Sequence, residues 1–306
     1  MINAKLKTSL SFIFFVIFIY YFYLYLNENS EIINLLKEIP LISVLIFFIL
    51  NLFSYTIKAL LNIYLFKSLD INLSFKEAFY LVYMNTLGNL LGPLKAGSAY
   101  KLQYFYKKYK LQVSKFISLN TSYAILSIFL NFLLIILIVP LTGIESSLIS
   151  VANSGVLILL TTFIFFLLFK LTISSEQYFN STILKNFTNG FNSLINYKNN
   201  FVKLGLITLI QIIFSTYCIY YSFEIFAFNI SFLNSLFYTA IGSFSGVVKI
   251  TPGNIGFYEV LMIWSQNLHG VITSQIIISS VFIRLVSYLS LFILSIYYFL
   301  IKLLKS

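Results

Sequence analysis

The chain has few of the side chains that most catalytic and metal sites need. It contains one cysteine and one histidine in 306 residues, which excludes an intramolecular disulfide, a cysteine cluster and a multi-histidine metal site. Asp70 is its single aspartate, so the paired aspartates of many metal-dependent sugar transferases are absent. H-E-x-x-H, Walker A and G-x-S-x-G motifs are also missing. These absences predict that the chain is no enzyme, uses no cofactor or metal, and does not transport with ATP by itself.

Charge is scarce too, because only 9% of the residues are Asp, Glu, Lys or Arg, against about 25% in an ordinary soluble domain. Apolar residues make up 59%, and the mean hydropathy is +0.93. Several apolar runs exceed the roughly 18–20 residues that a helix needs to cross a bilayer, and none alternates as β-barrel strands do. We therefore predict an all-α polytopic membrane protein, a single integral membrane domain over residues 1–306. Its first apolar run is expected to be a retained helix and not a signal peptide.

Six apolar runs are candidate transmembrane helices, and the charges between them set their orientation under the positive-inside rule. The two termini and the six-lysine stretch between residues 95 and 115 are expected in the cytoplasm. The loops around Glu31 and Glu145 are expected outside. The predicted spans are residues 8–26, 41–66, 116–140, 148–170, 203–228 and 271–301.

Two further apolar stretches, residues 78–93 and 235–269, must begin and end on the same side of the membrane in this topology. Both are interrupted by helix-breaking residues, which are tolerated at membrane depth where the backbone is buried in protein or lines a wet cavity. We interpret both as re-entrant helical hairpins; the alternative makes 235–269 two short full spans. The interruptions are Gly88, Gly92, Pro93 and Gly97 in the first stretch, and Gly242, Gly246, Pro252, Gly253 and Gly256 in the second.

The two predicted hairpins resemble each other. Residues 74–80 read SFKEAFY, residues 231–238 read SFLNSLFY, and each segment is followed by P-x-x-x-G. The first hairpin is entered from the inside and the second from the outside. The halves at about residues 40–140 and 203–302 therefore form an inverted-topology repeat, which in many transporters places the substrate path at the repeat interface.

The second hairpin carries the most informative segment, KITPGNIGFYE at residues 249–259. Arg284, the single arginine, lies near the middle of the last predicted span, where a lone charge costs on the order of 3 kcal/mol. It should pair with an acid, and Glu259 is the nearest candidate in sequence. A structural ion pair and an anion site at freed helix N–H groups both fit this pattern. The candidate substrate-binding residues here are Lys249, Pro252, Gly253, Gly256, Glu259 and Arg284.

The first hairpin repeats part of this pattern, with two lysines flanking a glycine after the helix break. The surrounding six-lysine stretch fits either a positive-inside determinant that contacts anionic lipid or a substrate funnel. Lys58, within the second predicted span, is expected to snorkel to the inner surface. The candidate substrate-binding residues of this half are Asn89, Pro93, Lys95, Gly97 and Lys101.

The segment TPGNIGFYE at 251–259, followed by Arg284, resembles the lysylphosphatidylglycerol synthase/flippase transmembrane-region family. Asn89 with Pro93, Gly97 and Lys101 resembles that family's earlier motif, and the resemblance covers nearly the whole chain. It implies a multi-helix membrane protein that moves lipids between leaflets, without a soluble synthase domain, so synthesis of an aminoacyl-lipid is not expected. The chain departs from the family at two positions, since Ser98 replaces an acidic residue and Lys101 replaces an arginine.

We therefore expect a lipid flippase or transporter that moves an anionic or aminoacylated phospholipid, or a lipid-linked headgroup, between the leaflets of a bacterial or archaeal cytoplasmic membrane. The alternative is a non-transporting accessory protein of envelope glycolipid or polysaccharide synthesis that binds a polyprenyl-phosphate lipid. The expected partners are membrane lipids, with a second copy of the chain or envelope-biosynthesis enzymes as further candidates, and no nucleic acid.

Overall fold

The computed structural model describes residues 30–91, 96–138, 192–194, 198–248, 254–264, 266 and 271–303. Within these ranges the chain is helical and forms no strand. Two of the expected spans, residues 8–26 and 148–170, lie outside the described residues. The main helices are α2 (Ser30–Lys37), α3 (Leu41–Lys67), α4 (Phe75–Leu91), α5 (Ala96–Tyr109), α6 (Val113–Ile138), α9 (Lys198–Glu224), α10 (Phe232–Val248), α11 (Phe257–Trp264) and α12 (Thr273–Leu303).

Four of these helices are long and apolar enough to cross a membrane, and they coincide with the other four expected spans to within a few residues. At 1.5 Å per residue, α3 is about 40 Å long, more than the roughly 30 Å of a hydrocarbon core. The chain is thus an all-α polytopic membrane protein. The four segments are Leu41–Lys67, Val113–Leu134, Asn199–Glu224 and Thr273–Ile301.

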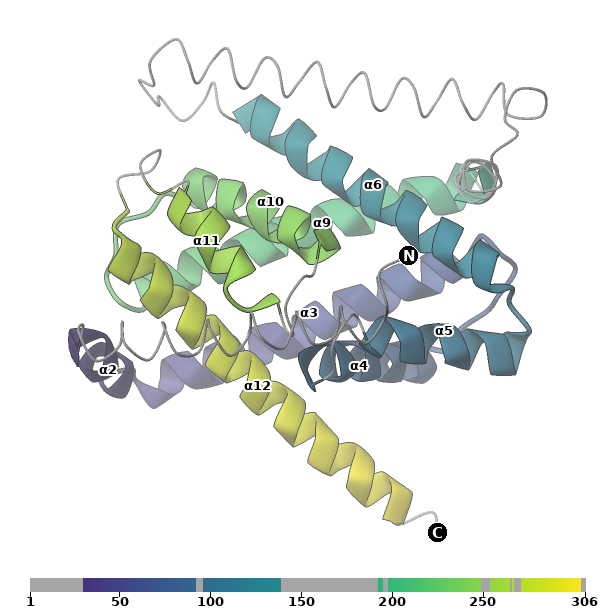
Figure 1. Cartoon of the computed structure of the whole chain (residues 1–306), viewed down its shortest axis with the longest axis horizontal. Helices are drawn as coiled ribbons and strands as arrows, with labels where there is room; N and C mark the ends of the chain where they lie inside the picture. Colours follow the sequence, from purple (N-terminus) through teal and green to yellow (C-terminus); the bar gives the residue numbers. More distant parts are fainter. Residues whose placement is uncertain are drawn as a thin grey trace, which may run out of the picture.

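Two pairs of shorter helices form antiparallel hairpins, α4 with α5 and α10 with α11 (Figure 1). In the first hairpin the hydroxyl groups of Tyr80 and Tyr100 lie 3.3 Å apart across the two limbs. Its second limb, α5, carries Lys101 and Lys107, so the hairpin extends beyond the expected residues 78–93 into the basic stretch that follows. The second limb of the other hairpin, α11, has eight residues and is about 12 Å long. That length favours a hairpin over two full spans.

The helix lengths repeat along the chain. Both α3 and α9 have 27 residues, and both α4 and α10 have 17. A shift of 157 residues takes Leu41 to Lys198 and Phe75 to Phe232, so the connection between the two helices is equally long in each half. The sequence similarity of the two hairpin starts therefore extends to a repeated unit of span, connection and hairpin limb.

The connections repeat in backbone detail. Asp70 (φ 59°) and Ala227 (φ 55°) occupy the left-handed region at equivalent positions. The next N–H in each connection returns to the helix, from Ile71 to the Phe66 carbonyl at 3.2 Å and from Phe228 to the Phe223 carbonyl at 3.1 Å. This is the hydrogen bond of a Schellman motif, which ends a helix at a left-handed residue. Each half thus leaves its span through the same turn.

The hairpin limbs also start alike. Ser74 Oγ accepts a hydrogen bond from the Glu77 N–H at 3.3 Å, and Ser231 Oγ accepts one from the Asn234 N–H at 3.0 Å. A serine at this place caps a helix start by satisfying an N–H that has no partner inside the helix. The serines that open the two similar sequence segments therefore fix where α4 and α10 begin.

The two repeated units run in opposite directions because α3 and α9 pack antiparallel. The ring centres of Phe47 and Tyr221 are 6.4 Å apart near one end of the pair, and those of Phe53 and Phe214 are 5.0 Å apart nearer its middle. Towards the other end, Lys203 Nζ lies 5.9 Å from the centre of the Tyr64 ring. This is the arrangement that an inverted repeat requires.

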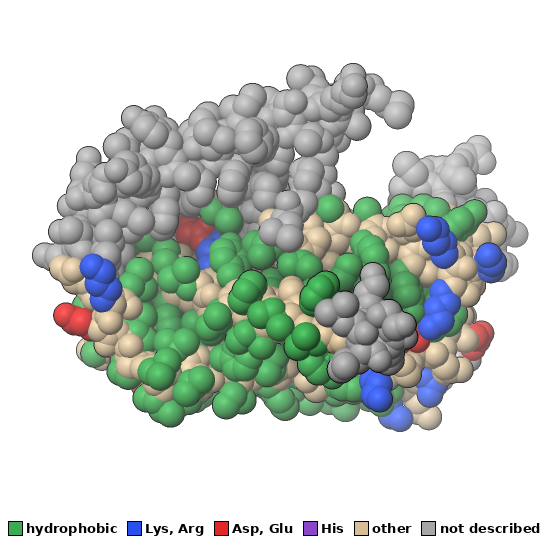
Figure 2. All heavy atoms as spheres, turned by 90° about the horizontal axis from the view of Figure 1, so that it is seen from below, with side chains coloured by type: hydrophobic (Ala, Val, Ile, Leu, Met, Phe, Trp, Pro, Cys, Tyr) green, Lys and Arg blue, Asp and Glu red, His purple; other side chains and the backbone are tan. Residues whose placement is uncertain are grey.

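Charged side chains gather at the ends of this helix pair. Lys67, Lys107 and Lys203 are exposed at one end, whereas Glu38 and Glu224 are exposed at the other. Figure 2 shows a broad apolar surface between the ends, with Lys and Arg concentrated towards one of them. The orientation in the membrane stays a prediction of the positive-inside rule, and the structure gathers at one end several of the lysines on which it depends.

Candidate functional site

The tip of the second hairpin is held by residues that leave the helical conformation. Asn254 has φ 60° and Gly256 has φ 85°, so the chain reverses direction where α11 begins. Asn254 Nδ2 donates to Ser245 Oγ at 2.7 Å, and Ser245 Oγ donates to the Gly242 carbonyl at 2.9 Å. An added Cβ on Gly242 would lie 3.1 Å from the Tyr258 ring. The tip is therefore anchored to α10 by an amide and packed against it closely.

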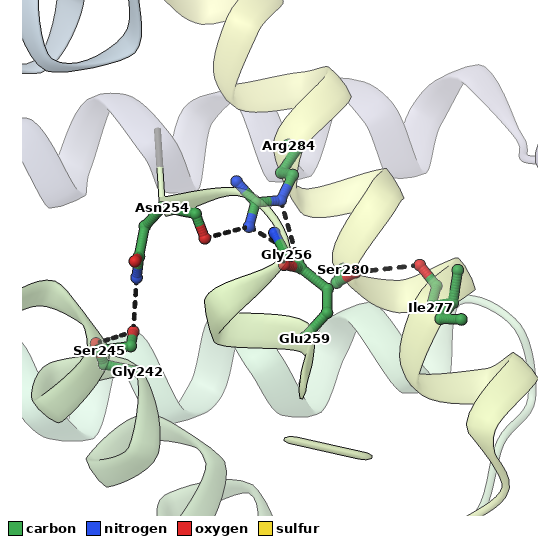
Figure 3. A network of polar contacts seen from close by, with 8 residues as sticks. All are labelled: Gly242, Ser245, Asn254, Gly256, Glu259, Ile277, Ser280 and Arg284. Carbon is green, nitrogen blue, oxygen red and sulfur yellow. Dashed lines mark hydrogen bonds and ion pairs between the residues drawn. The ribbon is translucent and has the colours of Figure 1, made fainter. Parts of the chain in front are cut away.

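Glu259, in the first turn of α11, joins this tip to the last span (Figure 3). Its Oε2 accepts a hydrogen bond from the Gly256 N–H at 2.8 Å, as a carboxylate does at the third position of a capped helix. Its Oε1 accepts from Arg284 Nε at 2.8 Å and also from Arg284 Nη2. Arg284 Nη2 in addition donates to the Asn254 carbonyl at 3.3 Å. The predicted pairing of Arg284 with Glu259 is present.

This ion pair is largely removed from solvent. The Glu259 side chain is 8% exposed and that of Arg284 is 19% exposed. The guanidinium and the positive end of the α11 dipole meet at one point, so the tip can attract a phosphate or carboxylate group. The same contacts also pin the hairpin to α12. The structural and the anion-binding interpretations therefore both fit the geometry.

The tip of the first hairpin is closed by neutral groups. An added Cβ on Gly97 would lie 1.9 Å from the Asn85 carbonyl oxygen, and one on Gly88 would lie 2.6 Å from Gly97 Cα. Asn89 Oδ1 accepts hydrogen bonds from the N–H groups of Gly97 at 3.1 Å and Ser98 at 3.4 Å, which caps the start of α5. Ser98 Oγ donates to Asn85 Oδ1 at 3.3 Å. None of the residues described at this tip is acidic.

Lys101 lies one turn further along α5 and is only 8% exposed. Its Nζ donates to Asn62 Oδ1 at 2.6 Å and lies 4.9 Å from the centre of the Phe66 ring. An aromatic face attracts a cation in this geometry. In the described ranges no carboxylate forms an ion pair with Lys101, so its charge is met by an amide oxygen and aromatic rings.

Glu77, which the sequence interpretation did not select, holds together the open end of the first hairpin. Its Oε1 accepts hydrogen bonds from the hydroxyls of Tyr104 at 2.7 Å and Tyr109 at 2.6 Å, and it lies 2.9 Å from Lys108 Nζ. Burial raises the pKa of Glu77, but the hydrogen bonds from Tyr109, Tyr104 and Lys108 outweigh it and place that pKa below its usual range. The signal for this cluster appears only once α4 and α5 are paired antiparallel.

The structure brings the described candidates together in two groups. Gly256, Glu259 and Arg284 meet at one tip; Asn89 and Gly97 meet at the other, with Lys101 one turn away. Within the described ranges, no three His, Cys, Asp or Glu side chains cluster as metal ligands would. The remaining candidates, Lys249, Pro252, Gly253, Pro93 and Lys95, lie outside the described residues.

Three asparagines at these sites escaped the sequence interpretation: Asn62, Asn85 and Asn254. Asn254 stands inside the segment that was singled out, between the Pro-Gly break and Gly256. Asn62 follows Lys58 by four residues on one helix, and that spacing places both on one face. Their polarity in an otherwise apolar setting was the available signal.

One protein family matches the sequence over residues 8–295, and its description reads Lysylphosphatidylglycerol synthase TM region. The match includes both hairpins and most of the last span. A comparison with curated proteins gives no match.

Proposed function

The chain belongs to the lysylphosphatidylglycerol synthase transmembrane-region family, and from that premise we propose that it is a lipid flippase. Its proposed substrate is an anionic or aminoacylated phospholipid, or a lipid-linked headgroup, carried between the leaflets of the cytoplasmic membrane. The protein provides a path and a binding site for the headgroup and makes or breaks no covalent bond.

The observation that carries this proposal is the buried ion pair of Glu259 and Arg284 at the tip of a broken helix. A buried pair adds little stability compared with apolar residues of similar volume, whereas ionisable groups at membrane depth typically mark a substrate path. The Arg284 guanidinium can pass from the Glu259 carboxylate to a phosphate, because both present oxygens that suit its planar fork.

The inverted arrangement of the two units supports transport over mere binding. In transporters built from inverted repeats, discontinuous helices of the two halves form one site, and movement of one half against the other opens it to alternate sides. Here each half supplies a hairpin packed on the antiparallel pair of α3 and α9. An accessory protein that only binds a lipid has no need of two opposed hairpins.

The test is a leaflet-resolved assay in proteoliposomes. The purified chain is reconstituted with fluorescent phospholipids, and a membrane-impermeant reductant bleaches the label in the outer leaflet only. The wild type should increase the fraction of label that becomes accessible with time. The double variant Glu259→Gln with Arg284→Gln should not, although it inserts and folds. Lipid binding without transfer by the wild type would support the accessory alternative and overturn the proposal.

A further inference from the structure

A stripe of polar side chains runs along one face of α3 through its membrane-spanning part. Asn51, Tyr55, Lys58 and Asn62 follow one another at intervals of four, three and four residues, which keeps them on one side of an α-helix. From Asn51 to Asn62 this stripe is about 16 Å long. It runs along a helix that is long and apolar enough to cross a membrane, so its polar groups need partners.

The two ends of the α3 stripe contact the elements that carry the two candidate sites. Asn51 Oδ1 accepts a hydrogen bond from Ser287 Oγ at 3.2 Å, and Ser287 follows Arg284 by less than one turn of α12. Asn62 Oδ1 accepts one from Lys101 Nζ at 2.6 Å. The stripe therefore connects the neighbourhood of the second hairpin tip with the buried lysine of the first hairpin.

Lys58 lies between these ends. The sequence predicts a side chain that extends towards the inner surface, but in the structure it points the other way. Its side chain is half-buried, and its Nζ lies 5.6 Å from the centre of the Tyr55 ring. Tyr55 precedes Lys58 by almost one turn, so the ammonium points back along the stripe and away from the lysine-rich end at Lys67. The reason is geometric, because side chains on a helix lean towards its N-terminus.

Two lysines within the described helices have no carboxylate as an ion-pair partner in the described ranges. Lys101 is buried and Lys58 is half-buried, whereas Arg284 is paired with Glu259 at the second tip. The two ion pairs of the described residues involve neither Lys58 nor Lys101. A buried ammonium without a counter-charge is unfavourable, so this arrangement favours a bound anion.

We propose that the α3 stripe binds the phosphate of an anionic lipid headgroup, with Lys58 as the contact midway between the two hairpins. This inference rests on the proposed flippase function and narrows its substrate. An aminoacylated headgroup adds an ammonium that Lys58 and Lys101 would repel, whereas a phosphodiester without that group supplies the missing negative charge. The acyl chains remain outside the protein, against exposed apolar side chains such as Leu285 and Phe292 on α12.

The test measures how far a ligand raises the thermal unfolding midpoint of the purified chain in neutral detergent, since a ligand that binds the folded state stabilises it. The probes are short-chain phosphatidylglycerol, short-chain phosphatidylcholine and inorganic phosphate. Lys58→Gln removes the charge, and Lys67→Gln, an exposed lysine at the end of the same helix, is the matched control. Phosphatidylglycerol should stabilise the wild type and Lys67→Gln at similar concentrations. Lys58→Gln should need at least about tenfold more.

Three outcomes overturn the inference: an unchanged phosphatidylglycerol response in Lys58→Gln, an equal response to phosphatidylcholine, or an equal response to inorganic phosphate, which would assign the site to a free anion. Lys58→Arg keeps the charge and should keep the response, and Lys101→Gln should weaken it even where Lys58→Gln does not fold.

The flippase assay separates this inference from the function on which it rests. If the wild type transfers lipid but its stabilisation by phosphatidylglycerol does not depend on Lys58, the flippase function is supported and the headgroup site on the α3 stripe is rejected. If the stabilisation by phosphatidylglycerol depends on Lys58 but no lipid is transferred, headgroup binding is supported and the flippase function is rejected.

Discussion

The two hairpins share a scaffold but place their carboxylates at opposite ends. In the second hairpin Glu259 lies at the tip and binds Arg284 of the last span. In the first hairpin Glu77 lies at the open end and binds Lys108, while the tip is closed by Asn89 and by the contact between Gly88 and Gly97. One hairpin is therefore tied to its neighbour by charge, and the other is held within itself by close packing and amides.

This difference teaches that the repeat conserves backbone and not chemistry. The turns after α3 and α9 and the serine caps of α4 and α10 coincide, because they determine how each limb leaves its span. The tips are free to differ, since a helix start can be satisfied equally by an amide oxygen or by a carboxylate. Only the charged tip brings a guanidinium to the point where the helix is broken.

The largest loss of stability is expected from substitutions that break the ion pair at the tip of the second hairpin. Glu259→Gln and Arg284→Gln each leave one buried charge without its partner, which typically costs about 3–5 kcal/mol of folding stability. The double change removes both charges and should restore much of that loss. Thermal unfolding of the wild type and the three variants measures the cycle. Four equally stable proteins would show that the pair is not coupled, and a double variant with restored stability and full lipid transfer would remove Arg284 from the site.

The next largest loss of stability is expected from a substitution that disrupts the close packing at the tip of the first hairpin. Gly97→Ala drives a Cβ into the Asn85 carbonyl, and the backbone of α4 must move, so we expect a loss of about 3 kcal/mol or more. Gly246→Ala in α10 is the matched control, because no neighbouring atom in the described part of the chain lies within 4 Å of the added Cβ. It should be neutral or gain about 0.5–1 kcal/mol from lower backbone entropy in the unfolded chain. Equal unfolding midpoints for both variants would contradict the close approach of α4 and α5.

The smallest effect concerns the carboxylate at the open end of the first hairpin. Because the pKa of Glu77 is lowered from its ordinary value of 4.5 in the folded state, its contribution to stability is complete above about pH 4.5 and is lost as the pH falls through the folded-state pKa. The wild type should therefore lose more stability on acidification than Glu77→Gln does. Glu38→Gln, an exposed acid at the other end of the molecule, is the control. Unfolding curves between neutral and acidic pH compare the three; parallel curves would show that the Tyr104 and Tyr109 contacts carry no pH dependence.

Much of this architecture could be predicted from the sequence because bilayer physics acts on local composition. Four apolar runs became four helices, and the scarcity of charge made Arg284 and Glu259 an obvious pair. The first hairpin was expected within residues 78–93 because that stretch is apolar, whereas its second limb, α5, lies in the basic stretch that follows. The burial of Lys101 depends on Asn62, 39 residues away, and on the Phe66 ring. Contacts of that kind form only when helices pack against each other, so the local sequence does not predict them.

The antiparallel packing of α3 and α9 has a consequence for the origin of the chain. Phe47 of one helix meets Tyr221 of the other, and under the 157-residue shift this contact exchanges with that between Tyr64 and the start of α9. A surface that pairs with an inverted copy of itself needs no covalent link between the copies. Two half-length chains, inserted into one membrane in opposite orientations, could form this interface as a dimer. Fusion of such halves into one polypeptide would fix which copy faces which side, and each hairpin tip could then change without altering the other.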